Sequence, residues 1–456
     1  MDLLMELLDA PVPVTAPAIL APAANDATND TRPALRFITC GSVDDGKSTL
    51  IGRLLLDSRS VLQDQLASVS RSGDVDLAQF TDGLMAEREQ GITIDVAYRY
   101  FSTAGRKFII GDAPGHEQYT RNMVTAASSA DAAVVLVDAT KLAWHGDTLA
   151  SPDHTLLAQT RRHSLLLKLL RVPSVVFAIN KLDAVADAPR AFVNIQRALK
   201  TFATAAELPL SAIVPISALR GDNVVSGNPG WCGYHGPSLL QTLEQLPAIA
   251  SESGAALSFP VQWVEKLASA SDGAPATGNG QRIFWGRVAT GSLAPGQQVS
   301  VMPGGKIATV SQVLDHARSP ASVTAGRSAG VILDRELDVS RGDWLLAHDG
   351  VFTTTSTIQA TVAWLDDEPL RAGRTYWAVH GHRWVKAKVT RVNHKIDVFS
   401  LDKLDADRLE ANAIGLVELA LQSPIAVLPY QHSRALGALV LVDTATHKTA
   451  GAALLN

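Results

Sequence analysis

The segment Gly41–Ser48 constrains this chain more than any other part of the sequence. It has two glycines with four residues between them, followed directly by Lys47 and Ser48. The apolar run Leu35–Cys40 in front of it predicts a strand, and Thr49–Leu56 behind it predicts a helix. Glycines allow successive backbone N–H groups to point at one phosphate, and a helix N-terminus adds the positive end of its dipole. A glycine-rich loop between a strand and a helix therefore indicates a phosphate-binding loop.

The residues of this loop have separate expected roles. Lys47 should reach the outer phosphates of a nucleotide as a catalytic group, and the Ser48 hydroxyl should ligate Mg²⁺. The alternative is a glycine-rich turn that matches the pattern by chance, and only motifs further downstream weigh against it. The residues expected to contact the nucleotide here are Gly41, Ser42, Val43, Asp44, Asp45, Gly46, Lys47, Ser48 and Thr49.

Size and composition are those of a globular protein with several domains. The chain has 456 residues, which suggests about three domains of ~100–200 residues each. An apolar content of 46% supplies packed cores, and no apolar run is long enough to cross a bilayer. The net charge of −5 disfavours general binding to nucleic acid. The two cysteines, Cys40 and Cys232, provide no disulfide framework, which fits a reducing cytoplasm.

Strand and helix patterns alternate in residues 34–250, after a polar tail. Residues 1–33 hold many Pro and Ala and no Lys or Arg before Arg32, so we expect a disordered tail and no targeting signal. Continuous apolar strands separated by helices predict an α/β domain with a mostly parallel sheet and helices on both faces. Further strands are expected at Lys107–Gly111, Ala132–Val137, Ser174–Ile179 and Ala212–Ile216, and helices at Tyr119–Ala130, Leu156–Arg171, Ala191–Glu207 and Ser238–Leu246.

The second motif, Asp112–His116, follows a predicted strand directly. An acid at a strand end such as Asp112 can hold the Mg²⁺ shell, and the backbone N–H of Gly115 can meet a γ-phosphate. His116 can orient the water that attacks this phosphate, so we expect it to be catalytic. A lone histidine at a helix start is otherwise an ordinary polar cap, and that alternative stays open.

The third motif, Asn180–Asp183, directly follows the predicted strand Ser174–Ile179. The Asp183 carboxylate can accept two N–H bonds from guanine, Asn180 can bond N7, and the Lys181 stem can stack on the base. Asn-Lys-x-Asp also suits a polar loop, so the motif is weak alone. Its placement at a strand end, in order after the first two motifs, predicts a guanine-nucleotide site. The residues expected to meet the base are Asn180, Lys181, Asp183 and, through their backbone, Ser217, Ala218 and Leu219.

A further candidate, Thr93, lies in the segment Glu87–Ile94 between the first two motifs. Its hydroxyl is the candidate second ligand for Mg²⁺ and a candidate catalytic group, in a loop that becomes ordered only with a triphosphate. A charged, solvated turn in front of a β-branched strand explains the same residues equally well.

The phosphate loop, the segment Glu89–Ile94 and the motif Asp112–His116 together resemble those of the translation-factor GTPases of the elongation factor Tu type. Longer strings narrow the resemblance to the large GTPase subunits of bacterial sulfate adenylyltransferase (ATP sulfurylase). The similarity extends from about Arg36 to Leu454. The strings that carry it are Val43–Leu55, Glu87–Phe101, His116–Met123 and Gln159–His163.

This resemblance implies an enzyme that uses GTP and Mg²⁺ and works with a separate small adenylyltransferase subunit, as a heterodimer or a higher assembly. GTP hydrolysis in that family drives ATP plus sulfate to adenosine 5′-phosphosulfate plus pyrophosphate in sulfate assimilation. The family usually has Asn at the position of Ser42 and Thr at that of Ala113. We expect function to survive, because both loops act through their backbone. No second phosphate-loop motif occurs, so no fused adenylylsulfate kinase is expected.

Two segments depart from the family pattern. Leu142–Leu156 looks like an insertion, for which a polar surface loop is favoured over a metal site. Asn228–His235 differs from the usual sequence of the family at this place, so the surface that faces the partner subunit can differ too. The insertion contains Trp144, His145, Asp153 and His154.

Beyond Ser258 short apolar alternations with Gly and Pro turns predict two antiparallel β-barrels, residues 256–350 and 355–456. The resemblance implies the same two barrels, and Leu267–Gly280 should be a loop in the first one. The basic stretch His380–Lys395 is favoured as a solvated sheet face over an RNA-binding surface. Expected strands are Gln281–Thr290, Gln298–Met302, Ala308–Val313, Ala329–Leu333, Ile358–Trp364, Tyr376–His380, Val385–Asn393 and Gly415–Gln422.

Two functions from different classes are thus in competition. The favoured one is the GTP-hydrolysing subunit of a sulfate adenylyltransferase, with no nucleic acid or membrane as partner. The alternative is a translation-elongation-type GTPase that carries aminoacyl-tRNA, a binding module driven by GTP. The longer strings favour the first, and the negative net charge weakly disfavours the second.

Overall fold

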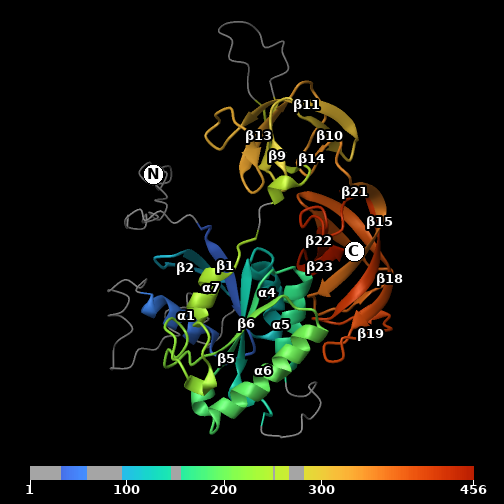
Figure 1. Cartoon of the computed structure of the whole chain (residues 1–456). Coiled ribbons are helices and arrows are strands. Elements are labelled where there is room, and N and C mark those ends of the chain that lie inside the picture. The colour runs from blue at the N-terminus through green and yellow to red at the C-terminus, as the bar shows by residue number, and fades with distance from the viewer. Residues whose placement is uncertain (1–31, 59–94, 145–155, 250–251, 267–281) are drawn as a thin grey trace, which may run out of the picture.

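The computed structural model describes residues 32–58, 95–144, 156–249, 252–266 and 282–456. An α/β domain is followed by two β-barrels, the second of which lies beside the α/β domain (Figure 1). Four of the predictions fall largely or wholly outside the described residues: the tail, Thr93, the centre of the insertion with His145, Asp153 and His154, and the loop at 267–280.

The sheet of the α/β domain has the strand order β2-β3-β1-β4-β5-β6. Neighbouring strands are parallel except at one edge, where β2 runs antiparallel to β3. The predicted mostly parallel sheet is therefore confirmed. Its strands are β1 (Leu35–Cys40), β2 (Ala97–Ser102), β3 (Lys107–Asp112), β4 (Ala132–Asp138), β5 (Val175–Asn180) and β6 (Leu210–Pro215).

Alternate residues of the central strands enter two different cores. In β4, Val134 and Leu136 pack with α1 and α7, whereas Val135 and Val137 pack with α4, α5 and α6. Burial of both faces explains why β4 has no polar residue before its last position. The helices are α1 (Lys47–Asp57), α4 (Thr120–Ala127), α5 (Ala158–Leu169), α6 (Ala188–Ala205) and α7 (Leu239–Gln245).

Capping residues set the helix starts. The side chain of Asp187 accepts the N–H of Arg190, so α6 begins at Ala188, three residues before its predicted start. Ser238 and Gln241 form a capping box at α7, close to the predicted start of that helix.

Both barrels are antiparallel and closed, as predicted. Barrel 2 has the order β10-β11-β13-β8-β7-β14, and barrel 3 has β17-β22-β23-β15-β21-β18 closed by a pairing of β17 with β18. The domain boundaries proposed from sequence stay predictions. Barrel 2 uses β7 (Ser258–Lys266), β8 (Arg282–Arg287), β10 (Gln298–Met302), β11 (Lys306–Leu314), β13 (Ser328–Leu333) and β14 (Trp344–Ala347), and barrel 3 uses β15 (Thr353–Trp364), β17 (Thr375–His380), β18 (Arg383–Ile396), β21 (Ile414–Val427), β22 (Ala438–Asp443) and β23 (Thr449–Leu455).

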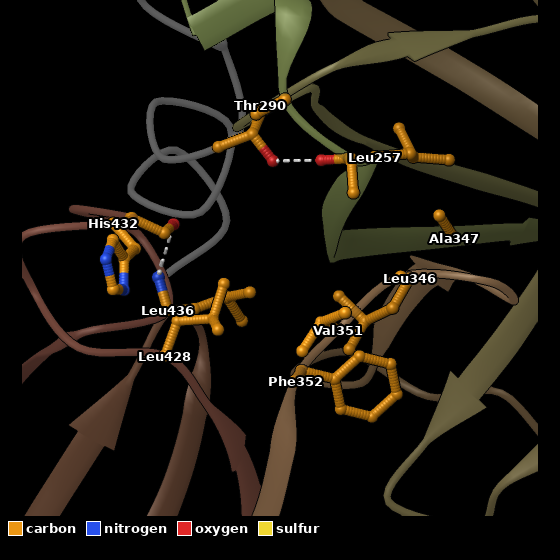
Figure 2. A pocket seen from close by; sticks show the side chains of 13 residues that line it. Leu257, Thr290, Leu346, Ala347, Val351, Phe352, Leu428, His432 and Leu436 are labelled. Carbon is orange, nitrogen blue, oxygen red and sulfur yellow. Dashed lines mark hydrogen bonds between the residues drawn. The ribbon is translucent and has the colours of Figure 1, made fainter.

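Apolar contacts join the three units. Ile414 and Tyr430 of barrel 3 belong to the same buried cluster as helices α4 to α6. Trp344 of barrel 2 packs with Leu436 of barrel 3. A small, mostly apolar pocket lies at this junction, with Phe352 on its wall (Figure 2). It is formed by the two barrels and not by the strand ends where the nucleotide motifs lie.

Two residues predicted at the surface are buried. Trp144, expected in a polar surface loop, is 5% exposed, and its indole N–H donates to Ala139 O over 3.1 Å. His380, expected in the solvated basic stretch, is buried at the junction of the two barrels, with its ring 5.1 Å from that of Trp344 of barrel 2. Along β18 the basic stretch alternates as predicted, with Lys386 and Lys388 exposed and their neighbours Val385, Ala387 and Val389 buried.

Candidate nucleotide site

The phosphate loop joins β1 to α1, as the sequence predicts. Gly46 has φ 93°, and a Cβ at this position would lie 2.5 Å from Asn180 Nδ2. Only glycine suits both the conformation and the close approach. Ser48 and Thr49 lie half-buried in the first turn of α1.

The carbonyl groups of the phosphate loop are all engaged. Lys47 Nζ donates to Gly41 O (3.3 Å) and Ser42 O (2.7 Å). Lys141, Lys181 and Asn180 donate to the next three carbonyls, of Val43, Asp44 and Asp45. Because donors hold the carbonyl oxygens, the loop is arranged to present N–H groups to an anion. One of these, the N–H of Ser42, binds the Asp45 carboxylate (2.6 Å) in this structure.

Lys47 is buried at the centre of this arrangement. Burial lowers the pKa of Lys47, and the nearby carboxylates of Asp45 and Asp112 act in the opposite direction. Burial likewise raises the pKa of Asp45, against hydrogen bonding and charge from Lys141. A buried, charged ammonium group is stabilised by nearby negative charge, which the phosphates of a nucleotide would provide.

The Asp112–His116 loop packs directly on the phosphate loop. A Cβ on Gly115 would collide with Lys47 Nζ and lie 3.0 Å from Ser42 O. Gly115 therefore lies against the phosphate loop and Lys47, and its contact with a γ-phosphate stays a prediction. Asp112 is buried at the end of β3, and one of its carboxylate oxygens accepts the hydroxyl of Thr39 (3.3 Å).

His116 is the last residue of this loop and is half-buried. Its Nε2 is buried and has no hydrogen-bond partner among the described residues. Its ring meets Tyr119 edge-on, with 6.3 Å between the centroids. Its catalytic role stays a prediction.

Asn180 joins three loops. Its Nδ2 donates to Asp45 O (2.8 Å), and its Oδ1 accepts the N–H of Ala218 (3.0 Å). The amide keeps one N–H and one lone pair, so a bond to guanine N7 stays a prediction. Ser217 N–H also donates to Asp222 O (3.1 Å), and contact of the Ser217, Ala218 and Leu219 backbone with the guanine carbonyl stays a prediction.

An ionic network of two buried carboxylates and two partly exposed lysines links the phosphate loop to the Asn180–Asp183 loop (the base loop), and no sequence motif predicted it. Lys141 Nζ lies 3.0 Å from Asp45 Oδ1 and 3.8 Å from Asp138 Oδ2, which in turn lies 2.8 Å from Lys181 Nζ. Burial acts to raise the pKa of Asp138, but hydrogen bonds from Lys181 and Thr140 lower it below its usual value. The sequence did contain a signal: Asp138 is the last residue of the apolar strand β4 and Lys141 lies three residues beyond it, at the same sheet edge as the motifs.

Asp183, the last residue of the base loop, is partly buried. Its carboxylate forms an ion pair with Arg220 (3.4 Å), a residue that no motif identifies. Arg53 of α1 also holds the carbonyls of Ala218 and Leu219. The two arginines thus brace the segments predicted to meet the base.

The donor set at the sheet edge fits Mg²⁺. Of the three predicted ligands, Ser48 and Asp112 lie at this edge, and Thr93 is outside the described residues. The described residues contain no group of three or more His, Cys, Asp or Glu side chains able to hold a metal. Mg²⁺ does not need one, because it uses one or two protein oxygens together with phosphates and water.

Comparison with known proteins agrees with this geometry. Residues 32–250 match the model of the elongation factor Tu GTP binding domain, and residues 357–456 match the GTP-eEF1A C-terminal domain-like model. Sulfate adenylyltransferase subunit 1 of Laribacter hongkongensis (strain HLHK9) is 41% identical over 439 residues, which are 94% of this chain and 86% of that one. The chain belongs to the sulfate adenylyltransferase subunit 1 family. The resemblance stated from the motifs is therefore confirmed, and with it the GTP-binding fold.

Other relatives agree. Subunit 1 of Francisella tularensis subsp. tularensis (strain SCHU S4 / Schu 4) is 41% identical over 92% of this chain and 86% of its own length. The bifunctional enzyme CysN/CysC of Xylella fastidiosa (strain Temecula1 / ATCC 700964) is 43% identical over 93% of this chain, which spans 66% of that enzyme. A solved structure of sup35 complexed with GDP covers 93% of this chain and 94% of its own, at 20% identity and a TM-score of 0.40, and is too distant to add to the argument. In the described part of the chain no helix is long and apolar enough to cross a membrane.

Proposed function

We propose that this chain hydrolyses GTP with Mg²⁺ and is the GTP-hydrolysing subunit of a sulfate adenylyltransferase. Hydrolysis drives ATP plus sulfate to adenosine 5′-phosphosulfate plus pyrophosphate on a separate small subunit. The observation that carries the proposal is the 41% identity to a sulfate adenylyltransferase subunit 1 over 94% of this chain. The cytoplasm, suggested by the cysteine content, is the expected compartment.

The site supports the GTPase part of this proposal. Lys47 and the loop N–H groups hold the phosphates, Ser48 and Asp112 hold Mg²⁺, and Gly115 meets the γ-phosphate. His116 orients the attacking water, which is the usual division of tasks in phosphoryl transfer. Asp183 selects guanine, aided by the loops that Asn180 joins. Thr93 completes the metal shell in this proposal.

A sulfate-dependent pyrophosphate assay tests the coupling. The purified chain is mixed with the small subunit, ATP and sulfate, and pyrophosphate release is followed with GTP, with GDP and without a guanine nucleotide. We expect GTP to accelerate product formation strongly, because forming a phosphosulfate anhydride is uphill and needs a second, downhill reaction. Equal yields in the three arms would disprove the coupling.

Co-purification separates this proposal from the translation-type alternative. We expect the chain to retain the small adenylyltransferase subunit and not tRNA. The net charge of −5 disfavours a nucleic-acid surface. A complex with aminoacyl-tRNA that depends on GTP would favour the alternative.

A further inference from the structure

Helix α5 buries an unusual number of polar side chains. Gln159, Thr160, Arg161, His163 and Ser164 are all buried on this helix, although long polar residues usually remain exposed. Buried polar groups usually have hydrogen-bond partners, so the partners of these side chains show what the helix contacts. The first of them, Gln159, contacts the Asp112–His116 loop, and no sequence motif indicates this contact.

The hydrogen bonds of Gln159 fix its orientation. Its Oε1 accepts from Arg162 Nη1 over 2.8 Å, and a guanidinium can only donate. The amide nitrogen therefore faces the other way, where it donates to Gly115 O (3.4 Å) and to His163 Nε2 (2.8 Å).

His163 supports this arrangement as a neutral ring. It is fully buried, and burial, followed by the charges of Lys47 and Arg162, lowers the pKa of His163 to about 3. Because Nε2 accepts from Gln159, the proton lies on Nδ1. His163 thus holds the Gln159 amide in the orientation that faces Gly115.

The contact with Gly115 O acts on the peptide that leads into His116. That carbonyl belongs to the peptide plane whose N–H is the backbone N–H of His116. Fixing one end of the plane fixes the start of His116, and therefore the direction in which its side chain leaves the loop. Gly115 itself has no side chain with which to hold this plane.

Helix α5 is itself anchored on barrel 3. Arg161 donates to Phe399 O (3.0 Å), and at the other end of the helix Arg171 donates to Tyr430 O (2.6 Å). Tyr430 returns a bond from its hydroxyl to Leu170 O (3.2 Å). Gln159 therefore lies on a helix that is bonded to barrel 3 near both of its ends.

We propose that Gln159, held by His163, is a positioning residue for GTP hydrolysis: through the Gly115 carbonyl it sets the placement of His116. This inference rests on the proposed function, because it assigns a residue to that hydrolysis. It predicts a loss in the catalytic step without a loss in nucleotide binding, since GDP has no γ-phosphate to meet this loop.

The test compares two substitutions on the full chain. Gln159→Leu removes all three hydrogen bonds, and Gln159→Glu keeps the shape and the Arg162 partner but cannot donate when ionised. For both we expect kcat for GTP hydrolysis to fall by about tenfold to a hundredfold, the usual cost of a misplaced catalytic group. The Kd for GDP should stay within about twofold. The matched control is Gln241→Leu, which removes a capping bond at α7 and should change thermal stability but not kcat.

A double variant tests the part played by His163. His163→Leu frees the Gln159 amide, so we expect a smaller loss in kcat, and no further loss when it is added to Gln159→Leu. Unchanged kcat in Gln159→Glu, or fully additive losses in the double variant, would overturn the inference while the proposed function stands. A parent chain that binds GTP without hydrolysing it, even with the small subunit, would overturn both.

Discussion

At the scale of single residues, His116 is the clearest candidate for the chemistry. Its Nε2 is buried without a hydrogen-bond partner in the described part of the chain, beside a loop that packs on Lys47. A buried ring nitrogen without a partner is costly, and a nucleophilic water held against a γ-phosphate would satisfy it.

We predict that His116→Ala leaves GTP affinity nearly unchanged, because the imidazole acts on water and not on the bound nucleotide. Hydrolysis should fall by about 10²-fold or more, as expected for the loss of a group that orients a nucleophile. Single-turnover hydrolysis and equilibrium binding on the same preparation separate the two effects. If turnover stays within a few-fold of the parent in the presence of the small subunit, His116 is only a polar cap.

Asp183 is the residue that we expect to select the base. Its carboxylate offers only acceptors, and charge-assisted hydrogen bonds to guanine contribute roughly 1.5–3 kcal/mol each. Adenine would leave the carboxylate facing a lone pair, so we expect rejection of ATP here by at least ~10⁴-fold. The Arg220 ion pair keeps the carboxylate in place but leaves acceptor positions free.

Asp183→Asn should turn the site toward xanthosine triphosphate. The new amide can donate one bond to the oxygen that xanthine has in place of the guanine amino group. Competition binding of the two triphosphates to the folded variant decides the matter. An unchanged preference for GTP would place the base pocket elsewhere.

At the scale of elements, the connection after β4 holds the site together. Lys141 reaches from this connection to the buried Asp45 of the phosphate loop, and Asp138 at the strand end pairs with Lys181 of the base loop. Loops from neighbouring parallel strands are therefore joined by charge at the sheet edge.

Lys141→Met should loosen this junction. It leaves the fully buried Asp45 with fewer partners, at a cost in unfolding free energy of about 1–3 kcal/mol, and GDP should bind more weakly. Lys168→Met is the matched control, because its ion pair with Glu207 is exposed and should add little to stability. Equal losses in the two variants, measured by urea unfolding, would show that the Lys141 pair contributes no more than a surface pair.

At the scale of the whole molecule, the junction of the two barrels carries a buried histidine. His380 Nε2 donates to Leu436 O over 3.2 Å, and the ring lies 5.1 Å from that of Trp344. Burial lowers the pKa of His380 to about 4, partly offset by the Leu436 bond, and the charge of Arg383 lowers it further. Arg383 is itself paired across the junction with Asp343.

The barrel junction should therefore weaken in acid. Between the ordinary histidine pKa of about 6.5 and the folded value of about 4, the unfolded chain binds more protons at this position. Stability from this group is full above about pH 6.5 and falls as the pH drops toward 4, by at most about 1.4 kcal/mol per pH unit. Calorimetry at several pH values should show that the unfolding temperature of the barrels falls as the pH drops. The fall should be smaller in His380→Phe. The same pH slope in both proteins would assign the effect to other groups.

The sequence by itself determined the fold class and the order of the nucleotide loops. Strand β1, the loop at Gly41 and helix α1 form from neighbouring residues, so their pattern is local and can be read from the chain. The long apolar runs indicated strands buried on both faces. The longer stretches shared with the family indicated the function, which hydrophobic periodicity does not contain. Some boundaries moved, as at α6, where Asp187 provides an earlier cap than the apolar pattern suggests. The strands β2, β7, β14, β22 and β23 were not predicted.

Tertiary structure decided which side chains meet. Trp144 and His380 belong to polar stretches but lie in the core, because packing at a distant junction outweighs their local pattern. The contacts of Lys141 with Asp45 and of Arg220 with Asp183 join residues that lie far apart in the chain or follow no motif. Gln159 reaches Gly115 across 44 positions, and only the close packing of α5 against the loop brings them together. Such pairs depend on how the elements pack, which the local pattern of residues does not contain.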